Sequence, residues 1–131
     1  MHRALAAAAT YFAIVFSLAF MLGVVRTLFV APRTGDLVAV LIETPIVLLA
    51  SWFAARLSVR QFSVPAHALD RLAMGLVAFT LLMTVETALG VMLFNRPLAQ
   101  QLSAYATPPG TIGLLGQVAF GFMPLLAALR R

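Results

Sequence analysis

The stretch LVAVLIETPIVLLASWFAAR, residues 37–56, decides the fold class of this chain. It has about the length, roughly 20 residues, that an α-helix needs to cross a bilayer core about 30 Å thick. One carboxylate, Glu43, interrupts the apolar run, and Pro45 follows two positions later. Because a charge among lipid tails costs several kcal/mol on most estimates, the stretch predicts a membrane helix and also singles out Glu43.

The composition extends this prediction to the whole chain of 131 residues. Hydrophobic residues make up 63% of it, against roughly 45–50% in a soluble domain. Four segments have spanning length, near residues 4–30, 37–56, 71–94 and 111–129. We therefore expect an all-α integral membrane protein in which residues 1–131 form a single transmembrane domain. Its four transmembrane helices should pack as a compact antiparallel bundle, because the loops between them are short.

The loops contain ordinary helix-breaking residues. They read APRTGD, SVRQFSVPAHALD and NRPLAQQLSAYATPPG, and proline and glycine in them end the preceding helices. Asp36, Asp70 and Thr111 are placed to cap the helices that follow. The first apolar run is longer than the roughly 7–15 residues of a signal-peptide core and lacks a small-x-small cleavage site, so we expect it to remain as a permanent helix.

The basic residues predict orientation rather than nucleic-acid binding. Nine arginines or lysines stand against four acidic residues, and they flank the apolar runs, as the positive-inside rule describes. With the N-terminus inside, the outer loops keep only Arg33 and Arg96. Both termini should then be cytoplasmic, in a bacterial-type inner membrane, with Trp52 near the inner interface. The cytoplasmic side would hold Arg3, Arg56, Arg60, Arg71, Arg130 and Arg131.

Each predicted helix carries one strongly polar residue at a similar depth. At about 1.5 Å of rise per residue, Arg26, Glu43 and Gln117 lie roughly 9–10 Å below the outer helix ends, and Glu86 lies roughly 13 Å below. Small residues share a face with each of them, as they do where membrane helices approach closely. These small residues are Ala19, Gly23, Ala39, Ala50, Ala54, Gly75, Gly90, Gly113 and Gly121. We predict that the four polar side chains converge in the outer half of the bundle.

Charge balance makes this layer a candidate site. One arginine cannot neutralise two ionised glutamates, and like charges in a low dielectric favour protonation of one carboxyl. Glu43 or Glu86 is therefore a candidate proton or substrate site. Arg26 would tune it or bind an anionic group, and Gln117 would donate orienting hydrogen bonds.

Three further residues are expected to support the site. Thr44 and Thr87 each follow a glutamate, in the similar segments LIETPIVLL and TVETALGVML. Pro45 removes a backbone donor and frees a carbonyl about one turn earlier, near Ala39, while Pro124 does the same near Phe120.

The sequence argues against several other chemistries. There is no cysteine, and the histidines, His2 and His67, lie far from the polar layer, so no metal site and no haem or other cofactor is expected. Nothing in the layer forms a nucleophile and base, so no catalytic residue is assigned and the protein is not expected to be an enzyme. An enzyme acting on lipid or quinone is the weakest alternative.

Two functions are therefore left open. The first is a proton- or ion-linked small-solute transporter or channel; because four short helices enclose little volume, we expect a homo-oligomer to form its solute path. The second is a structural or accessory membrane subunit, bound to a membrane protein partner, in which the polar layer is a helix-packing clasp. The partner in both is the lipid bilayer, and no nucleic acid is expected.

Overall fold

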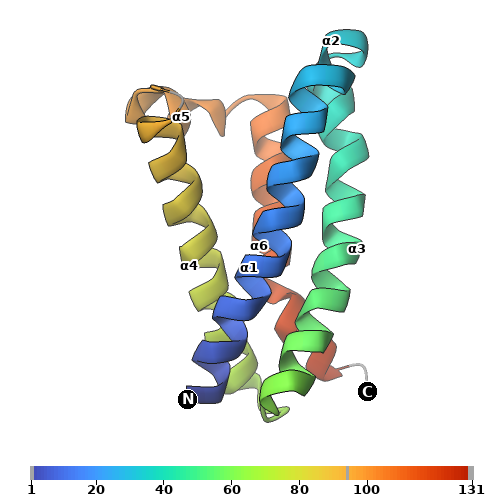
Figure 1. Ribbon diagram of the computed structural model, residues 1–131, viewed down its shortest axis with the longest axis vertical. Coiled ribbons are helices and arrows are strands. Elements are labelled where there is room, and N and C mark those ends of the chain that lie inside the picture. The colour runs from blue at the N-terminus through green and yellow to red at the C-terminus, as the bar shows by residue number, and fades with distance from the viewer. Residues whose placement is uncertain (1, 94, 130–131) are drawn as a thin grey trace.

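The structure is a computed structural model that describes residues 2–93 and 95–129. Within these residues every regular element is helical (Figure 1). In chain order the elements are α1 (His2–Val25), the π-helical turn η1 (Arg26–Val30), α2 (Ala31–Thr34), α3 (Asp36–Phe62), α4 (Ala68–Met92), α5 (Leu98–Ala104) and α6 (Pro108–Leu129).

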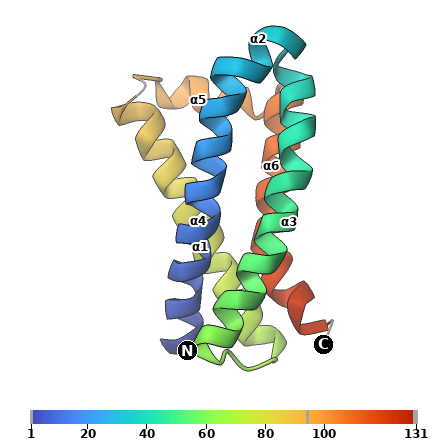
Figure 2. The ribbon, with the colours of Figure 1, turned by 45° about the vertical axis from the view of Figure 1, so that its right-hand side comes forward.

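Four helices are long and apolar enough to cross a membrane, which confirms the predicted fold class at this level. Their spans are His2–Thr34, Asp36–Phe62, Ala68–Met92 and Pro108–Ala127. The start of α1 and the end of α6 lie at the same end of the bundle as the α3–α4 connection (Figures 1 and 2). We call this the termini end, and the opposite end, which carries α2 and α5, the α2/α5 end.

The first spanning helix is longer than the predicted 4–30 because it continues through Pro32. Proline has no backbone N–H, so an ordinary helical turn cannot close there. The chain widens into η1 instead, and the Ala31 N–H donates to the Arg26 carbonyl five residues earlier. The helix finally ends at Gly35, whose φ of 88° suits glycine.

The second spanning helix also passes its predicted end at Arg56 and reaches Phe62. No residue between these two is a proline or glycine, so the helix continues beyond the apolar run. It ends where Ser63 adopts a left-handed conformation, with φ of 51°, two residues before Pro65. The helix therefore projects Arg60 from its last turn, where a cation is favoured by the helix dipole.

All three predicted caps are wrong. Gly35 and His67 occupy the N-cap positions of α3 and α4, and neither Asp36 nor Asp70 makes a capping hydrogen bond, although both lie in first turns. Thr111 lies inside α6, and its hydroxyl donates to the Tyr105 carbonyl at 2.7 Å. The last loop also contains an unpredicted helix, α5, because its proline residues lie at the ends of LAQQLSA and not within it.

The buried core lies in the half of the bundle near the termini end. Tyr11 of α1 stacks on Phe120 of α6 with 4.4 Å between ring centroids. Its hydroxyl donates to the Phe120 carbonyl at 2.5 Å. That carbonyl is the one predicted to be freed by Pro124, so a buried tyrosine satisfies the acceptor that the proline leaves without its helical partner.

Arg71 is placed differently from the predicted interfacial arginines. It lies in the first turn of α4, but only 5% of it is exposed. Its guanidinium donates to the carbonyls of Pro65 and Pro124, both at 3.1 Å. Arg71 thus joins the α3–α4 loop to the last turns of α6 at the termini end of the bundle.

α4 and α6 approach each other most closely at two glycines. A Cβ atom added to Gly75 would lie 1.8 Å from the Gly121 carbonyl oxygen. A side chain at Gly75 does not fit between the helices there. By sequence spacing, Gly75 lies on the same face of α4 as Glu86, and Gly121 lies on the same face of α6 as Gln117.

Candidate functional site

Arg26 and Glu43 form an ion pair between the first two spanning helices. Arg26 is the first residue of η1, and Glu43 lies in the second turn of α3. The distance from Arg26 Nε to Glu43 Oε2 is 2.6 Å, and the two side chains are 34% and 18% exposed. This pair ties the two helices at the widened turn that Pro32 imposes.

Glu86 and Gln117 form a second pair, between α4 and α6. The Gln117 amide Nε2 donates to Glu86 Oε2. The other amide atom, Gln117 Oε1, is buried and has no hydrogen-bond partner among the described residues. The partner of this glutamate is therefore neutral.

The four residues form two pairs and not a single network of direct contacts. Arg26 interacts electrostatically with Glu86, but the Arg26–Glu43 contact is the one ion pair seen within residues 2–93 and 95–129. α4 ends at Met92, so Glu86 lies about 9 Å inside the helix end and not roughly 13 Å as predicted, whereas Gln117, nine residues after the start of α6 at Pro108, lies about 14 Å inside its helix. Arg26 thus neutralises Glu43 directly, and Glu86 keeps no direct cationic partner in this part of the chain.

The two halves of the bundle are packed differently. The buried residues of α1 and α3 lie mostly in the halves of these helices near the termini end, and those of α4 and α6 do the same. They include Ala4, Ala7, Ala8, Tyr11, Val15, Ser51, Ala54, Ala55, Ser58, Arg71, Met74, Gly75, Ala78, Phe120 and Pro124.

Toward the α2/α5 end the long helices have few buried residues, namely Ala39, Val40, Leu82 and Gly90. Here α4 leans away from α1 (Figures 1 and 2). Glu86 lies in this half, and its side chain is exposed even though it contacts α6. The polar pairs therefore occupy the loosely packed half, above a closed core.

The predicted supporting residues have separate local roles. The Thr44 hydroxyl donates to the Val40 carbonyl at 2.8 Å, and its methyl group faces Gly116 of α6. Pro45 deprives the carbonyl four residues earlier, Leu41, of its helical donor, not that of Ala39 as predicted. The Thr87 carbonyl accepts a long hydrogen bond, 3.4 Å, from Gln101 of α5.

Only some of the small residues that the sequence predicted at close helix contacts lie at such contacts. Ala39, Ala54, Gly75 and Gly90 are buried as predicted. Gly113 has no atom within 4 Å of an added Cβ, and an added Cβ at Gly23 would meet only the Arg26 side chain. These two glycines do not mark a close helix–helix approach.

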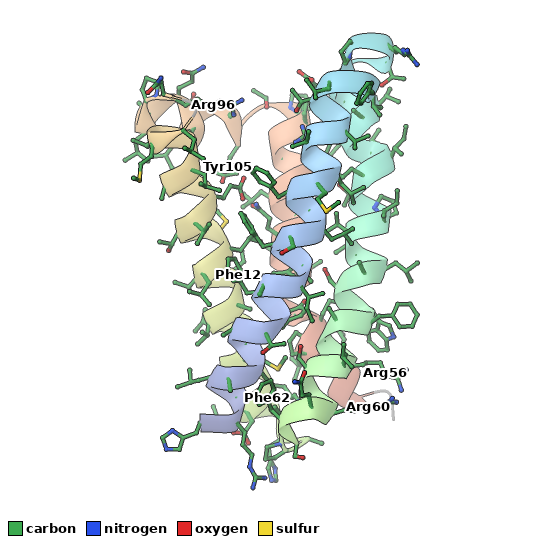
Figure 3. All side chains as sticks on the ribbon, in the orientation of Figure 1. Phe12, Arg56, Arg60, Phe62, Arg96 and Tyr105 are labelled. Carbon is green, nitrogen blue, oxygen red and sulfur yellow. The ribbon has the colours of Figure 1, made fainter. Side chains whose placement is uncertain are left out.

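Sequence reasoning missed Tyr105, which follows α5 and lies near Glu86. Figure 3 shows its side chain between α4 and α6 at the α2/α5 end. Partial burial, and then the negative charge of Glu86, raise the pKa of Tyr105 above its ordinary value of 10.0. No pattern in the sequence could have found this contact, because it depends on the fold of the last loop.

Glu86→Gln is expected to lower the pKa of Tyr105, because removal of the nearby negative charge makes the tyrosinate less unfavourable. Since folding raises this pKa, Tyr105 contributes stability fully below pH 10 and loses it as the pH rises through the folded value. Tyrosinate absorbance during an alkaline titration measures the shift, and Tyr105→Phe assigns the signal. An unchanged titration in Glu86→Gln would show that the two side chains are not coupled.

The chain matches no protein-family model, no curated protein and no solved structure. The function is therefore argued from the site alone.

Proposed function

We propose that the protein is a small transporter or channel of the bacterial inner membrane that binds a proton or a small cationic group at Glu86. In this proposal the four spanning helices are antiparallel, both termini are cytoplasmic, and the α2/α5 end faces outward. The arginine distribution supports this orientation, because among residues 2–93 and 95–129 the loops at the α2/α5 end carry only Arg33 and Arg96. Four helices enclose little volume, so a second copy of the chain would complete the solute path.

Glu86, an exposed residue at membrane depth whose carboxylate accepts from Gln117, is the observation that best supports this function. An ionised glutamate in contact with lipid would be costly. The Glu86 carboxylate turns towards Gln117 of α6 and lies near Tyr105, which supports a position facing the space between helices and not the lipid. A hydrated space there, above the closed core, would let a proton or cation reach the carboxylate from one side only.

The unpaired acceptor of Gln117 favours a ligand that donates hydrogen bonds. Glu86 supplies negative charge, and Gln117 Oε1 is a buried acceptor with no partner among the described residues. A buried acceptor without a partner carries a desolvation cost of about 1–3 kcal/mol. An ammonium or hydronium-like group between the two would recover part of that cost, whereas an anion would be repelled by both oxygens.

The transport proposal is tested with the protein in liposomes that contain a pH-sensitive dye. Small ammonium and guanidinium compounds are added outside, and the internal pH is followed. We expect at least one of them to change the internal pH faster than in protein-free liposomes. Identical traces with and without protein, for every compound, would contradict proton-linked transport.

The alternative function, a structural subunit held by a polar clasp, is favoured by the Arg26–Glu43 ion pair at 2.6 Å. In this alternative the two polar pairs fix the helix register and carry no solute. The ion pair can also serve the transporter, because it holds the first two helices while α4 and α6 present Glu86.

Arg26→Leu is expected to destabilise the bundle by about 2 kcal/mol, because it leaves Glu43 without its cation. Adding Glu43→Leu should restore most of this loss, whereas adding Glu86→Leu should not. Unfolding by a denaturing detergent gives the free energies for this double-mutant cycle. Equal rescue by both leucine substitutions would mean that Arg26 does not pair preferentially with Glu43.

A further inference from the structure

A groove lies on the outer face of α3 near the termini end, remote from the polar pairs. Its volume is about 200 Å³, and it is lined by Phe53, Arg56, Leu57 and Arg60. These positions recur at spacings of three and four, so they share one face of the helix. The two arginines point away from the bundle in Figure 3.

The groove concentrates positive charge that no described residue neutralises. Neither Arg56 nor Arg60 forms an ion pair within residues 2–93 and 95–129. The Arg56 guanidinium lies 6.0 Å from the centre of the Trp52 ring, a cation–π distance that restrains the arginine beside the groove. Two guanidinium groups four residues apart can both reach one phosphate, and the guanidinium fork suits phosphate oxygens.

The apolar part of the same face extends the groove towards the bilayer centre. Leu49, Phe53 and Leu57 are 62%, 60% and 56% exposed. Leu49 and Phe53 precede both arginines along the helix, and Leu57 lies between them. An acyl chain could lie along these side chains while its headgroup meets the arginines. A free phosphate ion would use only the charged part of the groove.

We propose that this groove binds the phosphate headgroup of an anionic phospholipid, with one acyl chain lying along α3. The binding surface is the one formed by Phe53, Arg56, Leu57 and Arg60, and the occupant is a lipid of the leaflet at the termini end. Anionic lipids attract arginine and lysine side chains at this level of the membrane. The groove would add contacts between the acyl chain and its apolar side chains to that electrostatic attraction.

The test compares thermal unfolding of the delipidated full chain in detergent with added phosphatidylglycerol, phosphatidylcholine of the same acyl chains, or inorganic phosphate. Phosphatidylglycerol is expected to raise Tm by roughly 5 °C relative to phosphatidylcholine, because a ligand that binds only the folded state stabilises it. The double variant Arg56→Gln/Arg60→Gln should lose this difference. The charge-matched control Arg3→Gln/Arg33→Gln, which changes two exposed arginines elsewhere, should keep it.

Three outcomes would overturn the proposal. These are an equal loss in both double variants, an undiminished difference in Arg56→Gln/Arg60→Gln, and an inorganic phosphate effect as large as that of the lipid. The count of retained lipids in native mass spectrometry provides a second measurement that does not depend on reversible unfolding. It should fall in Arg56→Gln/Arg60→Gln and not in the control.

Discussion

Glu86→Gln is expected to abolish proton-linked solute movement while leaving the protein folded. Glutamine has the shape of glutamate and offers a carbonyl oxygen to the Gln117 amide, so the contact between α4 and α6 is kept. It cannot take up a proton or balance a cation. We expect transport to fall on the order of 100-fold, since a positioned proton acceptor contributes about 10²–10⁴ to rates of proton transfer.

The matched control is Asp36→Asn, which also replaces a carboxylate by its amide. Asp36 is exposed in the first turn of α3, at the same end of the bundle but outside the two pairs. Transport should persist in this variant. Normal transport in folded Glu86→Gln would remove Glu86 from the mechanism and favour the clasp.

Gly75→Ala is expected to give the largest loss of stability among the small substitutions. The new methyl group would lie 1.8 Å from the Gly121 carbonyl oxygen, which is backbone and cannot turn aside. α4 and α6 must therefore separate, and overpacking of this kind costs about 1–3 kcal/mol. Separation should also weaken the Glu86–Gln117 contact, because the same two helices carry it.

Gly113→Ala is the control, because no atom lies within 4 Å of its added Cβ. Alanine favours a helix over glycine by about 1 kcal/mol, so this variant should be at least as stable as the wild type. Unfolding in mixed detergent micelles measures both variants. If Gly75→Ala were as stable as Gly113→Ala, the close approach of α4 and α6 would be wrong.

Apolar length was sufficient to predict the four membrane-length helices. Their ends were less predictable, because helix α3 continues to Phe62 in polar sequence that contains no breaker, and Pro32 widens its helix instead of ending it. Proline chemistry predicted the free Phe120 carbonyl, but not that Tyr11 would meet it, since that contact joins residues far apart in the chain.

The sequence singled out four polar residues at a similar depth, and the structure brings them together as two separate pairs. Charge alone indicated that Arg26 should pair with a glutamate, but the choice of Glu43 depends on which helices are neighbours. The burial of Arg71 could not be predicted either, because it also depends on which segments are neighbours in the fold. From the sequence, Arg71 cannot be distinguished from an arginine at the membrane interface. Its burial follows from hydrogen bonds to the carbonyls of Pro65 and Pro124, which only the fold brings close to it.

We propose that the polar pairs lie in a hydrated space open at the α2/α5 end and closed towards the termini end. The chain has no native cysteine, so single variants Glu86→Cys, Ser51→Cys and Ala106→Cys can be labelled with a membrane-impermeant thiol reagent from outside intact cells. Ser51 is buried in the closed core, and Ala106 is exposed in the loop after α5. We expect labelling of Glu86→Cys and Ala106→Cys and protection of Ser51→Cys. Protection of Glu86→Cys beside a labelled Ala106→Cys would contradict it.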